Sequence, residues 1–85
     1  MSLYIMDRLF IEYSKRAKQI DIEDYIDRVI IETLYKQATI GDCNTTEPSI
    51  IDQIKNSEWR IWKRMAGMPK EEAMKRYLDA IEPYI

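Results

Sequence analysis

The sequence predicts an all-α fold built from four helices. Apolar residues recur at spacings of three and four in four separate segments, and no segment keeps the strict alternation of a half-buried strand. The helix-breaking residues, two glycines and three prolines, fall between these segments or at their ends. A chain of 85 residues is long enough for one compact domain and too short for two. We therefore expect a single domain over residues 1–85, folded as a four-helix bundle.

The first predicted helix carries one apolar stripe, which is typical of a helix that packs against a core on one side. Cations gather toward its end, where they complement the negative pole of the helix dipole. The stripe consists of Leu3, Met6, Phe10, Tyr13, Ala17 and Ile20.

The second predicted helix begins near Asp21 or Asp24 and stops at Gly41, because carboxylates suit a first turn and glycine suits a helix end. The run from Val29 to Ile31 also fits a strand, but the segment is long and does not alternate, which favours a helix. Its expected apolar face consists of Ile22, Ile26, Val29, Ile30, Thr33 and Leu34.

Two further helices are expected after a polar loop at residues 42–49. The third runs from about Ile50 to Ala66, with Ile54, Ile61 and Met65 on one side and two tryptophans nearby. In the fourth helix, Pro69 suits the first turn and Pro83 limits the extension. Its apolar stripe consists of Ala73, Met74, Tyr77, Leu78 and Ile81.

Composition excludes several classes of function. There is no histidine, so histidine-based catalysis and most zinc sites are excluded. The net charge of −2 argues against binding of duplex nucleic acid, which needs a basic stripe. The chain contains no apolar run of about 18 residues and no signal peptide pattern. A single cysteine, Cys43, forms no internal disulfide and suits a reducing compartment.

The end of the second predicted helix carries the most functional information. Tyr35 offers a flat ring and a hydroxyl, and Lys36 offers a mobile positive charge beside it. This pair suits a ligand that has both an aromatic ring and a phosphate. The competing interpretation is a core tyrosine, a solvated lysine and an ordinary helix end.

Several separated blocks together resemble the acyl-coenzyme A (acyl-CoA) binding protein family. They are YKQATIGD at residues 35–42, Asn44-Thr45, Pro48, Trp59-x-x-Trp62, Gly67 and KEEAMKRY at residues 70–77. Their spacing matches the family without a gap, whereas the N-terminal helix matches poorly. The resemblance implies an up-down-down-up helical bundle and a non-enzymatic carrier of long-chain acyl-CoA thioesters, without a further cofactor.

The resemblance also implies roles for individual residues. Adenine would stack on Tyr35, the ribose 3′-phosphate would meet Lys36, and Tyr77 would contact the nucleotide. Trp59 would lie near the ligand. By the same resemblance Trp62 would belong mainly to the core.

The chain departs from the family pattern at two ligand positions. Glu32 stands where a tyrosine is usual, and Glu58 stands where a basic residue usually precedes the first tryptophan. Both carboxylates would repel a polyanionic ligand. Lys55, one turn before Glu58, is a candidate for the missing charge, and Arg28 stands where an apolar lining residue is common.

From the sequence we therefore predict a cytoplasmic, monomeric acyl-CoA carrier that binds no nucleic acid and spans no membrane. Tyr35, Lys36, Tyr77, Trp59 and Lys55 are the predicted ligand contacts. One alternative is a diverged helical interaction module that has lost the ligand, which the acidic residues favour. The other is the binding module of a larger acyl-CoA enzyme.

Overall fold

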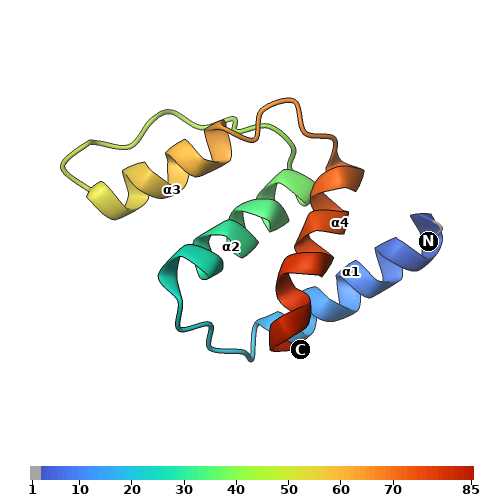
Figure 1. Ribbon diagram of the computed structural model, residues 1–85. Coiled ribbons are helices and arrows are strands. Elements are labelled where there is room, and N and C mark those ends of the chain that lie inside the picture. Colours follow the sequence, from blue (N-terminus) through green and yellow to red (C-terminus); the bar gives the residue numbers. More distant parts are fainter. Residues whose placement is uncertain (1–2) are drawn as a thin grey trace.

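The structure, a computed structural model, describes residues 3–85 and the side chains from residue 4 onward. It contains four helices: α1 (Leu3–Ala17), α2 (Tyr25–Thr39), α3 (Gln53–Lys63) and α4 (Lys70–Ile81). A short 3-10 helix, η1 (Glu82–Tyr84), follows α4 (Figure 1). Residues 3–85 contain no strand, so the predicted all-α class is confirmed. Nor does any helix of this part of the chain have the length and hydropathy needed to cross a membrane.

Helix α4 is the element on which the core is assembled. It packs against α2 and against α1, whereas α3 packs mainly against α2. Figure 1 shows α1 and α4 running in one general sense and α2 and α3 in the other, which agrees with the predicted up-down-down-up order. The resulting molecule is flat, with principal extents of 41 × 28 × 15 Å. Helices α1 and α2 therefore meet chiefly through their shared contacts with α4.

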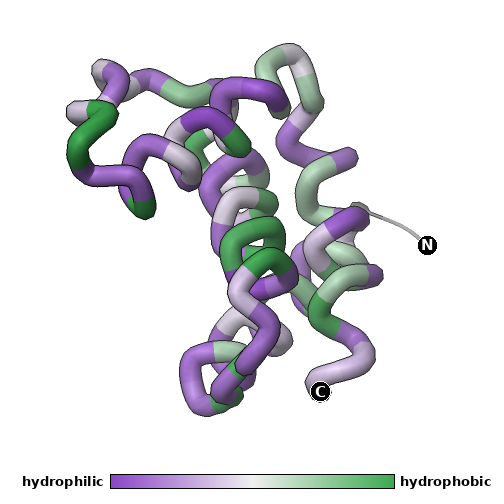
Figure 2. The backbone as a smooth tube through the Cα atoms, turned by 60° about the vertical axis from the view of Figure 1, so that its left-hand side comes forward, coloured by the Kyte–Doolittle hydropathy of each residue, from purple (hydrophilic) through white to green (hydrophobic). Residues whose placement is uncertain are grey.

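The core lies where α1, α2 and α4 converge. It includes apolar side chains from the stripes predicted for the first and fourth helices, and Figure 2 shows hydrophobic segments alternating with hydrophilic ones along the helices. The buried members are Met6, Phe10, Ile22, Ile31, Leu34, Ala38, Ala73, Tyr77, Leu78 and Ile81. The predicted core role of Leu3 lies outside the described side chains.

The ends of α2 follow from local chemistry. Asp24 is the N-cap, since its carboxylate accepts a hydrogen bond of 2.9 Å from the amide of Asp27. Of the two predicted starts, Asp24 is therefore right. Gly41 follows the helix with a φ of +102°, a conformation that side chains disfavour, and its amide donates to the carbonyl oxygen of Lys36 at 3.2 Å.

The predicted apolar face of α2 was partly wrong. Ile26 and Ile30 are 57% and 37% exposed, whereas Ile31 is only 5% exposed. The reason is that α4 covers one side of α2 and α3 covers only a part of another, so the apolar residues of this helix cannot be buried on every side. Ile31 therefore packs in the core while its neighbours remain at the surface.

Helix α3 is shorter than the predicted span from Ile50 to Ala66. Asp52 caps it by accepting a 3.2 Å hydrogen bond from the amide of Lys55, so the helix begins at Gln53. Ile54, which we expected on its apolar side, is 63% exposed. The predicted start at Ile50 was wrong because it followed the apolar periodicity and did not take the Asp52 cap into account.

Three smaller boundaries also differ from the prediction. Helix α1 ends at Ala17 and not at Ile20, whose amide closes a turn by donating to the Ala17 carbonyl oxygen at 3.1 Å. Pro69 is the N-cap of α4 and lies just before its first turn. The 3-10 helix after α4 was not predicted, because Pro83 was taken as a stop.

A buried amide ties three segments together. The side chain of Gln37 is fully buried, and its Nε2 donates to Asp42 Oδ1 and to the carbonyl oxygen of Met68, both at 2.9 Å. Its Oε1 accepts a 3.1 Å hydrogen bond from Trp62 Nε1, which also donates to the carbonyl oxygen of Gly41 at 3.0 Å. Gln37 thereby links the end of α2, the end of α3 and the loop before α4.

Asp42 completes this network as an ionised carboxylate. Besides the Gln37 amide, it accepts a 2.9 Å hydrogen bond from the backbone amide of Gly67. The hydrogen bond from Gln37 lowers the pKa of Asp42 most, followed by that from Gly67, and the positive charge of Lys63 adds to them. The acceptor that the network needs is thus present at neutral pH.

Replacing Gln37 tests this network. Gln37→Leu keeps the approximate volume but leaves the Met68 carbonyl and the Asp42 carboxylate without a buried donor, so the free energy of unfolding should fall by about 1–3 kcal/mol. Urea denaturation measures the change. Gln19→Leu, at an exposed position, is the control and should change stability by less than about 0.5 kcal/mol. Equal losses in both variants would contradict the role of the network.

Candidate functional site

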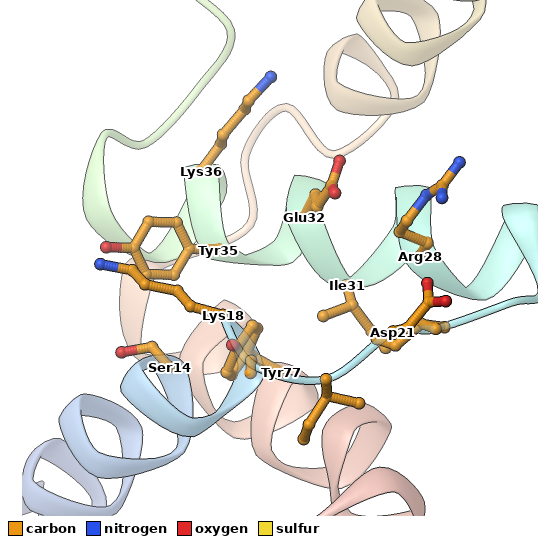
Figure 3. A pocket seen from close by; sticks show the side chains of 12 residues that line it. Ser14, Lys18, Asp21, Arg28, Ile31, Glu32, Tyr35, Lys36 and Tyr77 are labelled. Carbon is orange, nitrogen blue, oxygen red and sulfur yellow. The ribbon is translucent and has the colours of Figure 1, made fainter.

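A pocket of about 380 Å³ lies between the end of α1, the loop that follows it, and α2 (Figure 3). Ser14 and Lys18 line it at the end of α1. From α2 it is lined by Glu32, Tyr35 and Lys36. Tyr77 of α4 also lines the pocket. Helices α1 and α2 both pack against α4 and make few direct contacts with each other, which leaves room for the pocket between them.

Three aromatic rings from three helices support the pocket. Tyr35 stacks on Phe10 of α1, with ring centroids 5.6 Å apart and planes inclined by 16°. Tyr77 meets the same Phe10 edge-on, with a centroid distance of 5.0 Å, and lies 6.0 Å from Tyr35. Such pairs are favourable beyond the area that they bury. Tyr35 is still 41% exposed, so its ring is fixed by Phe10 and yet accessible from the pocket.

The sequence allowed Tyr77 to be either a core residue or a residue that lines the ligand site, and the structure gives it both positions. It is 3% exposed and belongs to the core, and it also lines the pocket. Burial raises the pKa of the Tyr77 hydroxyl, with a smaller contribution from Tyr35. The hydroxyl is therefore neutral at physiological pH and keeps a proton that it can donate.

Charged side chains surround the pocket with a small excess of positive charge. Lys18, Arg28 and Lys36 contribute cations, and Asp21 and Glu32 contribute carboxylates. Figure 3 shows Lys18 next to Tyr35 at one end and Arg28 with Asp21 toward the other. The pocket thus offers an aromatic face beside positive charges, an arrangement that suits a planar anionic ligand.

Lys36 lines the pocket, but its ammonium points away from the other pocket side chains and toward Trp62 of α3 (Figure 3). Its Nζ lies 5.4 Å from the ring centroid of Trp62, close enough for a cation–π interaction. Trp62 is itself buried and fixed by the Gln37 network. The buried network therefore also sets the direction in which Lys36 leaves α2.

Two of the five predicted ligand contacts lie elsewhere. Trp59 donates from Nε1 to the carbonyl oxygen of Thr45 at 3.0 Å, and Lys63 Nζ lies 5.8 Å from its ring centroid. Lys55 is exposed in the first turn of α3. Neither Trp59 nor Lys55 lines the pocket, and Glu58 does not line it either. The structure brings together Tyr35, Lys36 and Tyr77 only.

Sequence reasoning missed the contribution of α1 and the loop after it. Ser14, Lys18 and Asp21 line the pocket, although none was predicted as a site residue. The available signal was the spacing of Ser14 and Lys18, which places them on one helical face beside the core stripe. The N-terminal helix matches the family poorly, so no residue role could be transferred there.

No group of three or more histidine, cysteine, aspartate or glutamate side chains within residues 3–85 is arranged to hold a metal ion. The pocket residues are an aromatic cluster, aliphatic side chains and charged side chains at the rim. This composition is suited to binding by stacking, ion pairing and apolar contact.

Comparisons with known sequences match the chain to a family model and to relatives named for acyl-CoA binding. Residues 8–81 match the model of the family described as acyl-CoA binding protein. In Oryza sativa subsp. japonica, acyl-CoA-binding domain-containing protein 3 is 39% identical over 74 residues, which cover 86% of this chain and 48% of the relative. Domain-containing protein 1 of the same organism is 38% identical, over 86% of this chain and 81% of the relative. The chain thus spans about half of one relative and most of the other.

Comparisons with solved structures agree. The crystal structure of Oryza sativa acyl-CoA-binding protein 2 superposes with a TM-score of 0.83 at 31% identity, over 93% of this chain and 89% of that one. The solution structure of the acyl-CoA binding protein from Babesia bovis T2Bo gives a TM-score of 0.76 at 26% identity, over 99% and 93%. The predicted bundle type is thereby confirmed. The chain belongs to the acyl-CoA binding protein family.

Proposed function

We propose that this chain binds acyl-CoA esters without catalysing a reaction on them. The observation that carries the proposal is the meeting of Tyr35, Lys36 and Tyr77 at one pocket of a member of this family. Tyr35 stacks against the adenine, Lys36 pairs with the ribose 3′-phosphate, and the Tyr77 hydroxyl donates to the nucleotide. The names of the rice relatives, which are acyl-CoA-binding proteins, support the same ligand class.

Stacking, charge and pocket volume all favour a nucleotide head group in this pocket. Stacking of a base on an aromatic side chain contributes roughly 1–3 kcal/mol. Lys18 and Lys36 attract phosphates, whereas Glu32 opposes them. A volume of about 380 Å³ lies within the range of small-molecule pockets, ~300–1,000 Å³.

We further propose that long acyl chains are preferred. Each buried methylene group contributes about 0.8 kcal/mol, so a long chain adds most where apolar surface continues beyond the head group. Exposed isoleucines on α2 and α3 offer such surface at Ile26, Ile30 and Ile54. Trp59 and Lys55 would then contact the part of the ligand that extends along α3.

The cellular role that we propose is a monomeric cytoplasmic carrier and buffer of these esters, acting as one domain over residues 1–85. The family match and the absence of a membrane-spanning helix among residues 3–85 are compatible with this role.

A second candidate function is that of a binding module within a larger enzyme. Human enoyl-CoA delta isomerase 2 is 33% identical over 79 residues, which cover 78% of this chain and 20% of the isomerase. That relative favours the candidate, because a similar segment there forms a small part of a longer protein.

Ligand discrimination tests the proposed function directly. Palmitoyl-CoA should bind one per chain, and palmitate should bind at least about tenfold more weakly, because it lacks the ring and phosphates that Tyr35 and Lys36 address. Calorimetric titration of both ligands measures the difference. Equal affinity for palmitate and its CoA ester would contradict the proposal.

The stacking role of Tyr35 is tested against a tyrosine on the same helix. Tyr35→Ala should weaken binding of palmitoyl-CoA by about 1–3 kcal/mol through loss of stacking. Tyr25→Ala is the matched control, since Tyr25 is 38% exposed, similar to Tyr35, and does not line the pocket. Circular dichroism checks that both variants fold. If both variants lost the same affinity, Tyr35 would have no special role.

The two unusual carboxylates should differ in their effects. Glu32→Gln removes a negative charge from the pocket and should tighten binding of acyl-CoA about threefold to tenfold at low ionic strength. Glu58→Gln removes the same charge outside the pocket and should change affinity less, in contrast to the expectation from sequence position alone. Titrations at two salt concentrations compare them, because screening should reduce the Glu32 effect. A larger gain in affinity from Glu58→Gln than from Glu32→Gln would indicate that the phosphates bind near α3 and not in the pocket.

A further inference from the structure

Helix α1 has a second stripe that the core does not use. Tyr4, Arg8, Ile11 and Lys15 follow one another at spacings of four, three and four, so they lie on one face of α1, and Lys18 continues the spacing just past the end of the helix. All five are exposed, with Tyr4 at 69% and Ile11 at 53%. We call these five residues the outer stripe. It contains an aromatic, an aliphatic and three basic side chains and no acidic one.

The part of the outer stripe from Tyr4 to Lys15 faces away from the core, whereas Lys18 follows the end of α1 and lines the pocket. Helix α1 lies at one edge of the molecule and packs against α4 (Figure 1). It does so through the stripe that contains Met6 and Phe10. A face with Tyr4 and Ile11 at the surface is not needed for the fold, so its apolar residues call for another explanation.

Charge sets the outer stripe apart from the remainder of the chain. Residues 3–18 carry four basic and two acidic side chains, whereas the whole chain carries 13 and 15. The two acidic residues, Asp7 and Glu12, flank the outer stripe on either side. The Arg8 guanidinium carbon lies 5.8 Å from the ring centroid of Tyr4, so cation and ring form a single surface feature. The local excess of positive charge contrasts with a net charge of −2.

We propose that the outer stripe docks this protein on the surface of a membrane that contains anionic lipids. Helices that lie in a bilayer interface combine an apolar side with lysine and arginine, and tyrosine is enriched at that depth. Ile11 and the Tyr4 ring would enter the boundary between head groups and acyl chains. Arg8 and Lys15 would reach lipid phosphates while their stems lie along the apolar surface.

The position of Lys18 relates this surface to the pocket. Lys18 ends the outer stripe and also lines the pocket next to Tyr35 (Figure 3). Docking through the outer stripe would therefore bring the pocket close to the bilayer, where a lipid-derived ligand could pass between them. The docking itself does not depend on the proposed function, because bare vesicles without acyl-CoA suffice to test it.

The test is flotation of the full chain with vesicles of phosphatidylcholine alone and with about 30% phosphatidylserine. The chain should bind the anionic vesicles and not the neutral ones, and binding should weaken as salt rises. Each cation near such a surface contributes about a fivefold change in partitioning, so Arg8→Gln with Lys15→Gln should lower it about 25-fold. Lys18 stays unchanged because it also lines the pocket.

Two matched controls distinguish binding through the outer stripe from non-specific binding of the chain to vesicles. Lys70→Gln with Lys75→Gln removes the same charge from exposed positions on α4 and should leave partitioning within about threefold of the unmodified chain. Ile11→Ser should lower partitioning about threefold to tenfold. Ile51→Ser should have little effect, although Ile51 is 91% exposed and thus more exposed than Ile11.

Three results would overturn the proposal. One is the absence of binding to anionic vesicles at low salt. Another is an equal loss of binding in the α4 control or in Ile51→Ser. The third is binding to soluble polyglutamate that depends on Arg8 and Lys15 without binding to vesicles, since that would assign the outer stripe to an acidic protein partner.

Discussion

The fold depends on one fully buried amide. Gln37 donates two hydrogen bonds and accepts one, and its partners come from three segments: the loop after α2, the end of α3 and the loop before α4. Helix α3 buries only Asn56 and Trp62, so it has little apolar surface with which to hold its place. Hydrogen bonds must therefore provide the stabilisation of α3 that burial of apolar surface does not provide. They can do so because Gln37 is shielded from water and every partner is satisfied.

The hydrogen bonds of Gln37 also affect the pocket, because they fix Trp62 and Trp62 contacts Lys36. Trp62 is fixed by Gln37 and by the Gly41 carbonyl, and Lys36 lies over its ring. On the other side of the pocket, Phe10 holds the rings of Tyr35 and Tyr77. The site is thus preorganised from two directions: by the polar network at the end of α2 and by the aromatic contact between α1, α2 and α4. Preorganisation lowers the entropy that a ligand would otherwise lose on binding.

Sequence patterns predicted the fold correctly where a helix buries one apolar stripe in the core. Apart from Leu3, whose side chain lies outside the described part of the chain, the stripes of the first and fourth helices were right because α1 and α4 both pack in one core. The start of α3 was wrong because the Asp52 cap, a local hydrogen bond, outweighs the apolar periodicity of the isoleucines around it. The exposure of Ile30 could not be predicted, since it depends on how much of α2 its neighbours cover.

The candidate site was predictable only in part. Tyr35 and Lys36 are adjacent in sequence, and their resemblance to a family pattern pointed to them together with Tyr77. Lys18 joins them only after α1 and α2 have folded onto α4, so its spacing from Ser14 alone does not identify it as a site residue. Trp59 followed the same family pattern, yet in this chain its indole donates to the Thr45 carbonyl and lies outside the pocket.

The central claim is that the nucleotide head group binds between α1 and α2. The most direct test is a titration of the isotopically labelled chain with coenzyme A, followed by two-dimensional nuclear magnetic resonance of the backbone amides. We expect the largest shifts within residues 14–22, the segment that contributes most of the α1 side of the pocket, and at Tyr35 and Lys36. Shifts confined to α3, around Lys55 and Trp59, would contradict it and place the head group on the other side of α2.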